Sequence, residues 1–167
     1  MKKLKKYTLL GILFVILTGT LAHFVYQWSG NNFIVGFFVP VSESTWEHMK
    51  LCFFPMLLYS IFMNRRLKWE YSCVTSALLA GNLLGTMLIP VIFYTYTDIL
   101  GNHYLPLDIA TFMISVLVAF AMAYRLTLSC RLHAHTTWLA AMVFAMLLFY
   151  LVFTYFPPNH GIFAPPG

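Results

Sequence analysis

Long apolar runs separated by short polar stretches dominate the chain. Five runs approach the roughly 20 residues that an α-helix needs to cross a hydrocarbon core of about 30 Å. They cover residues 7–27, 44–63, 71–96, 107–124 and 137–156. The pattern therefore predicts an all-α, polytopic membrane protein, a bundle of five transmembrane helices that forms one domain over residues 1–167.

The first apolar run has two interpretations. It follows four lysines, and Thr20-Leu21-Ala22 would serve as a cleavage site, so it could be a secretory signal. Its length favours a retained first span with a cytoplasmic N-terminus. Cleavage would leave the remaining topology unchanged.

Composition agrees with a membrane protein. Hydrophobic residues make up 60% of the chain and charged residues only 9%, and the mean hydropathy is +0.78. Soluble domains carry roughly a quarter charged residues. The chain therefore lacks the polar surface of an ordinary water-soluble globule.

The basic residues predict the orientation. Nine of the ten basic residues share one side of the membrane if the chain has five spans. Four lie at the N-terminus, three after the second run and two around the fourth connector: Lys2, Lys3, Lys5, Lys6, Arg65, Arg66, Lys68, Arg125 and Arg131. Basic residues concentrate on the cytoplasmic side. We therefore expect a cytoplasmic N-terminus and an extracytoplasmic C-terminus in the cell (plasma or inner) membrane, and we interpret the net charge of +5 as an orientation signal rather than a nucleic-acid site.

The three cysteines, Cys52, Cys73 and Cys130, lie in or beside apolar runs without CxxC spacing. An odd number in such positions favours buried thiols over a disulfide framework.

The most polar stretch of this largely apolar chain is residues 42–50, Ser-Glu-Ser-Thr-Trp-Glu-His-Met-Lys. Ser44 and Glu47 match a capping box, in which each side chain bonds the backbone of the other. Trp46 is typical of an interfacial anchor. Capping explains Ser44 and Glu47 without any further role, and a polar site at the mouth of a span is the alternative.

Capping explains the other polar residues of this stretch less well. On a helix beginning here, Glu43, Glu47 and Lys50 share one face, and Ser44 and His48 share the adjacent one. The two carboxylates repel each other unless a cation lies between them. Lys50, a metal ion or a protonated carboxyl would each remove that repulsion.

Two later spans carry polar groups. Asn82 lies between Gly81 and Gly85, whose spacing is typical of a close helix-packing face, and it needs an interhelical partner. Asp108 shares a helix face with Thr111; it either complements the helix dipole behind Pro106 or belongs to a site.

The predicted topology gathers acids and imidazoles at the extracytoplasmic ends. His48, His103 and His160 lie on that side, and His23 lies near the outer end of the first span. Two imidazoles and an acid can hold zinc with one position open for water. We therefore predict metal ligation by His48 with His103 or His160; Ser44, Glu47, His48 and Asp108 are the candidate catalytic residues, with Glu47 as general base. Glu43, Trp46, Lys50 and Asn82 are candidate binding residues.

The box at residues 42–50 resembles a family of short, multi-spanning bacterial membrane proteins of unknown function. The chain is similar to that family in two features: an (Asn/Ser)-Glu-Ser-x-Trp-Glu-His-x-Lys box at the start of the second span, and a Pro-Pro-rich tail. The family tends to place His directly after the prolines, whereas here Asn159 separates Pro158 from His160. The resemblance covers most of the chain and implies no activity.

A looser similarity concerns Ser44-x-x-x-His48, which resembles the Ser-x3-His element of membrane zinc hydrolases related to the alkaline ceramidases. The resemblance implies a metal-activated water held by Ser, Asp and His residues, with Asp98 or Asp108 as the Asp. Those enzymes have seven spans and a His-x3-His on the last, and this chain has neither.

Three functions follow from the sequence. The first is a metal-dependent, zinc-binding hydrolase that acts on a lipid or amphiphile at the outer face. The second is a module that binds or transports a small solute or lipid headgroup, with no bond broken. The third is a non-catalytic accessory subunit, and here a homo-oligomer or a membrane partner subunit is expected. Membrane lipid is the expected partner in all three functions. Apart from the zinc of the first function, we expect no cofactor.

Overall fold

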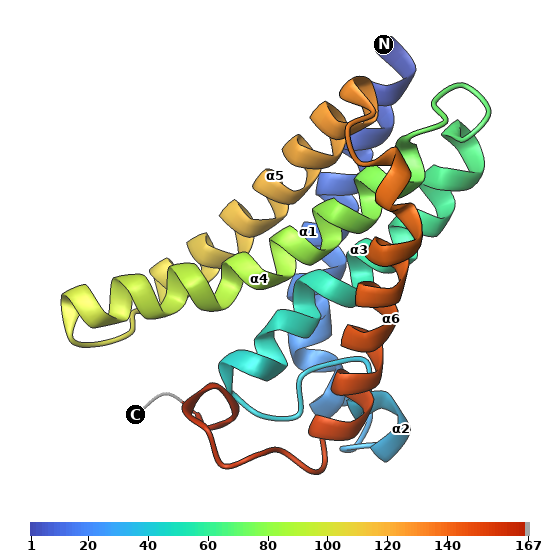
Figure 1. Ribbon diagram of the computed structural model, residues 1–167. Coiled ribbons are helices and arrows are strands. Elements are labelled where there is room, and N and C mark those ends of the chain that lie inside the picture. The colour runs from blue at the N-terminus through green and yellow to red at the C-terminus, as the bar shows by residue number, and fades with distance from the viewer. Residues whose placement is uncertain (166–167) are drawn as a thin grey trace.

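The computed structural model describes residues 1–165, and all its regular elements are helices. Five are long: α1 (Lys2–Trp28), α3 (Thr45–Leu67), α4 (Val74–Leu100), α5 (Leu105–Ser129) and α6 (Thr136–Phe153). Three are single turns: α2 (Phe33–Gly36), η1 (His133–His135) and η2 (Gly161–Phe163). The N-terminus and the tail after α6 lie at opposite ends of the bundle (Figure 1).

Within residues 1–165, four segments are long and apolar enough to cross a membrane: Lys2–Trp28, Val74–Leu100, Leu105–Ser129 and His133–Phe153. Large apolar side chains on these helices are exposed, as they are in a protein whose outer surface faces lipid. The all-helical, membrane-type fold expected from the sequence is confirmed at this level. The fifth expected segment, α3, is less apolar because it contains Glu47, Lys50 and two arginines.

Helix α3 forms the centre of the bundle. Its buried residues include Met49, Cys52, Phe53 and Met56, which pack in one core with residues of α1, α4, α5 and α6. Pro55 lies inside α3 and has no N–H to bond the carbonyl of Leu51, four residues earlier. A Cβ at Gly19 would lie only 2.5 Å from that carbonyl oxygen, so α1 approaches α3 where the proline leaves the backbone open.

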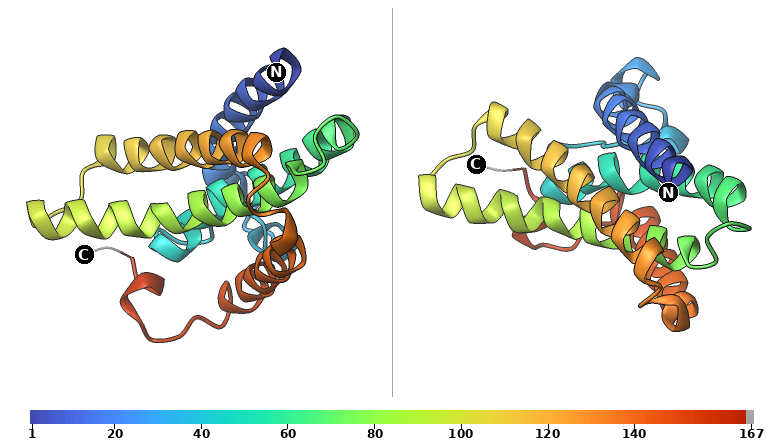
Figure 2. Two further views of the ribbon diagram at one scale, coloured as in Figure 1. Left: turned by 45° about the horizontal axis from the view of Figure 1, so that its top comes forward. Right: turned by 90° about the horizontal axis from the view of Figure 1, so that it is seen from above.

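Helices α4 and α5 form an antiparallel hairpin through the face that the glycine spacing predicted. A Cβ at Gly81 would lie 2.7 Å from the carbonyl oxygen of Ala119, and one at Gly85 would lie 2.7 Å from its Cβ. Only glycine permits this approach. The connected end of the hairpin extends away from the other helices, as the views in Figure 2 show.

A disulfide joins Cys73, at the start of α4, to Cys130, at the end of α5, so the expectation of three free thiols is wrong for these two. The antiparallel hairpin brings the two Cα atoms within 5.2 Å, although 57 residues separate them in sequence. Local spacing gives no sign of such a contact. Cys52 is a free, buried thiol, as expected.

Candidate functional site

A cavity of about 440 Å³ lies where the last turns of α1, the start of α3 and the α4–α5 hairpin meet. We call it the vestibule. Its polar lining comprises His23, Glu43, Thr45, His48, His103, Asp108 and Thr111. Its apolar lining comprises Leu51, Ile89, Phe93, Leu105, Phe112 and Pro165. Segments far apart in sequence thus contribute imidazoles, carboxylates and apolar side chains to one space.

Three potential metal ligands converge on one wall of the vestibule. One donor atom from each of His23, Glu43 and His48 lies within 4.8 Å of the others. His48 Nε2 is 3.4 Å from Glu43 Oε2, and His23 Nε2 is 4.0 Å from Glu43 Oε1. The two imidazole rings also lie close together, with centroids 5.3 Å apart. Both imidazoles are partly exposed, so the cluster is accessible from the vestibule.

The start of α3 orients His48. Ser44 caps the helix, its hydroxyl accepting a hydrogen bond from the N–H of Glu47. His48 Nδ1 lies 3.0 Å from the carbonyl oxygen of Ser44. A carbonyl can only accept, so Nδ1 carries a proton and Nε2 is the nitrogen directed toward Glu43. A backbone partner of this kind is typical of metal-ligating histidines.

The facing wall carries a second polar group from the α4–α5 hairpin. His103 Nδ1 lies 3.3 Å from Asp108 Oδ2, and the hydroxyl of Tyr96 donates to Asp108 Oδ1. Asp108 lies in the first turn of α5, where the helix dipole favours a negative charge. Asp108 therefore lies at a helix N-terminus and also lines the vestibule, and its membership of a functional site stays a prediction.

Glu47 and Lys50 form a buried ion pair outside the vestibule lining. Lys50 Nζ donates to Glu47 Oε2 at 2.7 Å, to Thr154 Oγ1 at 2.6 Å and to the carbonyl of Gly36 at 3.0 Å. Glu47 Oε2 also accepts from the N–H of Val41 at 2.9 Å. Of the three ways to remove the repulsion between Glu43 and Glu47, the structure shows Lys50 paired with Glu47, whereas Glu43 lies beside His23 and His48. The capping box is only half formed, because the Glu47 carboxylate bonds Val41 and Lys50 rather than Ser44.

This pair fixes the connector that carries Glu43. Lys50 ties the connector and the end of α6 to α3. The hydroxyl of Tyr155 adds a hydrogen bond of 2.7 Å to the carbonyl of Phe33. The lysine is fully buried and Glu47 is 3% exposed. Glu47 and Lys50 therefore hold the architecture around the vestibule and cannot reach a molecule inside it.

Three other candidate residues from the sequence have roles in holding the fold. Ser44 is buried and serves as the helix cap. Trp46 is not an interfacial anchor: it packs in the core against Tyr150, Phe153 and Phe163. Asn82 finds the interhelical partner that it needs, donating to the carbonyl of Phe53 at 3.4 Å.

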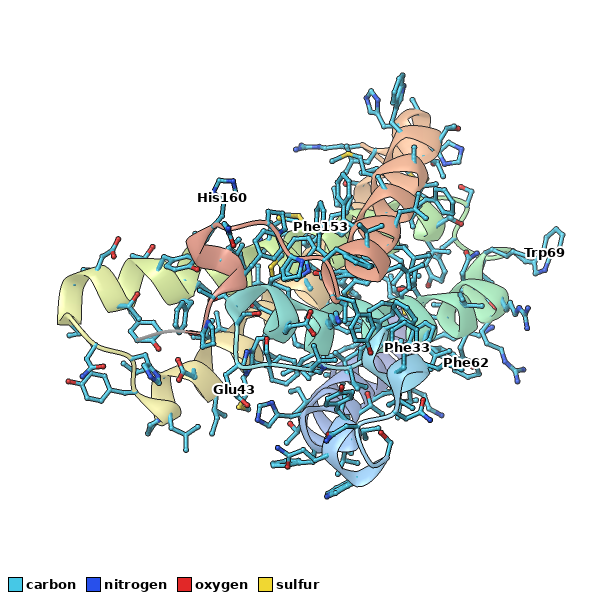
Figure 3. The ribbon with its side chains drawn as sticks, turned by 90° about the horizontal axis from the view of Figure 1, so that it is seen from below. Phe33, Glu43, Phe62, Trp69, Phe153 and His160 are labelled. Atoms are coloured by element: carbon cyan, nitrogen blue, oxygen red, sulfur yellow. A yellow bond between two sulfur atoms is a disulfide. The ribbon has the colours of Figure 1, made fainter. Side chains whose placement is uncertain are left out.

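The histidines separate into two groups. His48 and His103 line the vestibule, but they stand in different clusters. His160 is exposed on the tail, outside the vestibule lining, and points away from Glu43 (Figure 3). The potential metal ligand that sequence reasoning did not assign is His23. Its signal was its place near the end of the first span, on the same side as His48.

Comparison with known proteins places the whole described chain in one family. No curated protein and no solved structure shows significant similarity to the chain. A model of a family of unknown function, DUF6512, matches residues 1–165. The chain therefore belongs to the DUF6512 family, whose function is unknown.

Proposed function

We propose that the protein is a metal-dependent hydrolase that holds zinc at His23, Glu43 and His48 and acts on a lipid or other amphiphile in the vestibule. The observation that carries the proposal is the convergence of these three ligands on a cavity with both polar and apolar walls. Two imidazoles and a carboxylate, with a fourth position left open, are the ligand set of several catalytic zinc sites.

The donor atoms lie near enough to one another for side-chain rotation to bring them to the spacing of a zinc site. In a tetrahedral site with bonds of about 2.0–2.1 Å, neighbouring donors lie about 3.4 Å apart. His48 Nε2 and Glu43 Oε2 already have that separation, 3.4 Å. His23 Nε2 lies 4.0 Å from the other carboxylate oxygen, Oε1, and one donor from each of the three residues lies within 4.8 Å of the others, so zinc binding requires rotation of these partly exposed side chains. Bound zinc would supply Lewis-acid activation of water and of the scissile carbonyl.

The vestibule suits an amphiphile. Its volume of about 440 Å³ lies in the range of small-molecule sites, roughly 300–1,000 Å³. Leu51, Ile89 and Phe93 supply apolar contacts for a hydrocarbon chain, and the histidines and acids supply polar contacts. Of the Ser-x3-His element that resembles alkaline-ceramidase-like hydrolases, only His48 is placed to bind a metal, because the hydroxyl of Ser44 caps α3.

We further propose that α3 is a fifth transmembrane span. Its 23 residues extend about 35 Å at 1.5 Å per residue. Its charged groups Glu47 and Lys50 are paired inside the bundle, as charges within a membrane must be. Together with the basic residues at the opposite end, this supports a cytoplasmic N-terminus, an extracytoplasmic vestibule and a place in the cell membrane.

Zinc stoichiometry tests the site. Protein purified in detergent through a tag without histidines would be stripped with chelator, dialysed against zinc and analysed for metal. We expect one zinc per chain in the wild type and a loss of most of it in His23→Ala, Glu43→Gln and His48→Ala. His160→Ala is the matched control and should retain zinc. A wild type without zinc, or ligand variants that bind as much as the control, would remove the proposal.

Hydrolysis is tested separately with a fluorogenic long-chain acyl ester in mixed micelles. We expect turnover that chelator abolishes and zinc restores. Stoichiometric zinc without turnover of acyl esters or amides would favour the binding or transport role. Wild-type behaviour of the ligand variants, together with a tightly copurifying protein, would favour the accessory-subunit role.

A further inference from the structure

Hydrolysis in the vestibule needs a group that transfers protons, and Glu47 cannot be that group. Its carboxylate is buried in the pair with Lys50 and does not line the vestibule. Among the described lining residues, five can transfer protons, and three of these are the proposed metal ligands. The remaining two are His103 and Asp108.

We propose that His103 is the proton-transfer residue of the vestibule and that Asp108 is its positioning residue. The proposal rests on the proposed hydrolytic function and adds a catalytic group to it. Both residues come from the α4–α5 hairpin and stand apart from the cluster of His23, Glu43 and His48.

Hydrogen bonding fixes the imidazole of His103. Asp108 Oδ2 lies 3.3 Å from Nδ1, and an ionised carboxylate can only accept, so Nδ1 carries the proton. Nε2 is then the nitrogen left with a lone pair. The same arrangement, a carboxylate behind the Nδ1–H of a histidine base, sets the tautomer in catalytic triads.

Asp108 is itself held from two sides. The hydroxyl of Tyr96 donates to Oδ1, and His103 occupies Oδ2. Its place in the first turn of α5 favours the negative charge. A fixed carboxylate stabilises the imidazolium that forms when Nε2 takes up a proton. Tyr96 and Asp108 therefore support the proton transfer without touching the substrate.

The reaction balances without any redox partner. Nε2 of His103 accepts one proton from the attacking water as the water oxygen bonds to the acyl carbon. The imidazolium then gives that proton to the leaving oxygen or nitrogen as its bond to the acyl carbon breaks. The products are an acid and an alcohol or amine, and His103 returns to its starting state.

His103→Ala tests the catalytic role. We expect zinc binding to persist while turnover of the fluorogenic acyl ester falls by about 10²-fold or more, the usual contribution of a general acid–base. Added imidazole should restore part of the lost turnover, because the emptied space can admit it. His133→Ala, at an exposed histidine of η1 outside the vestibule lining, is the matched control and should keep wild-type turnover.

The tautomer of His103 tests the positioning role without activity. Nitrogen NMR of histidine-labelled protein should show the Nδ1–H form of His103 in the wild type and a shift toward Nε2–H in Asp108→Asn. Wild-type turnover in a zinc-loaded His103→Ala variant would overturn the inference and leave the proposed function standing. An Nε2–H tautomer in the wild type would overturn it as well, whereas a wild type without zinc or turnover would defeat both proposals.

Discussion

The pair of Glu47 and Lys50 shows how one side-chain contact organises a whole end of the protein. Lys50 lies inside the bundle and bonds the carboxylate of Glu47, the hydroxyl of Thr154 and carbonyls of the connector before α3. A buried charge without a partner is far more costly than a buried pair. The pair therefore keeps α3, α6 and the Glu43 connector together.

Removing one member of the pair should destabilise the protein strongly. In Lys50→Met the carboxylate of Glu47 stays buried without its cation, which costs about 3–5 kcal/mol. We expect a large fall in the denaturation midpoint in detergent. The double variant Glu47→Gln/Lys50→Met, which has no unpaired charge, should recover part of that loss. Lys5→Met, at an exposed lysine, is the control and should change little. Equal midpoints for the two lysine variants would contradict this account.

At the residue scale, sequence reasoning found local contacts and missed distant ones. Ser44 as a helix cap and the spacing of Glu47 and Lys50 were predictable because both depend on neighbours within one turn. The burial of Lys50 was not, since it depends on Gly36 and Thr154, which reach it through the fold. His23 was missed for the same reason: it meets His48 only across a helix interface.

The glycine face of α4 sets how the hairpin packs. Gly81 faces the backbone of Ala119, and a backbone atom cannot move aside as a flexible side chain can. Since α5 carries Asp108 at its start, this contact also sets where the second wall of the vestibule lies.

Gly81→Val should therefore disturb the hairpin. Overpacking of a close contact costs about 1–3 kcal/mol, and this outweighs the roughly 0.3–0.5 kcal/mol that valine gains over glycine in helix propensity. We expect a lower denaturation midpoint. Gly161→Val is the matched control, because a Cβ there would meet nothing within 4 Å. An unchanged midpoint for Gly81→Val would show that the two helices do not approach each other as described.

Helices were the most predictable part of the fold. Hydrophobic runs placed each long helix close to its observed position, and the extra turns, such as residues 2–6 of α1 and 64–67 of α3, are polar ends that hydropathy alone does not assign. The Gly81 and Gly85 spacing predicted a close packing face on α4, and the structure shows that α5 packs there. The direction in which the connected end of the α4–α5 hairpin extends was not predictable, since it depends on how the hairpin diverges from the other helices.

At the scale of the whole molecule, the disulfide and the basic residues provide a test of orientation. Cys73 and Cys130 lie at the end that also carries Arg65, Arg66 and Arg131. If that end is cytoplasmic, the cell keeps both thiols reduced, because disulfides rarely persist there. The structure shows that the two sulfurs are close enough to bond once the protein meets an oxidant.

We therefore expect the pair to be reduced in growing cells and oxidised after purification in air. Cells would be quenched in acid, denatured and treated with a maleimide polymer, so that each free thiol adds a visible mass on a gel. A chain with all three cysteines reduced adds three masses, and a chain with the disulfide adds one, at Cys52. A single mass from growing cells would reverse the proposed orientation.

The most direct test of the central claim is the coordination of bound metal, measured by zinc X-ray absorption on the purified, zinc-loaded protein. We expect a first shell of nitrogen and oxygen at about 2.0–2.2 Å, with the scattering of two imidazoles that falls to one in His23→Ala. Sulfur in the first shell, or a spectrum that His23→Ala and His48→Ala both leave unchanged, would show that the zinc site is elsewhere.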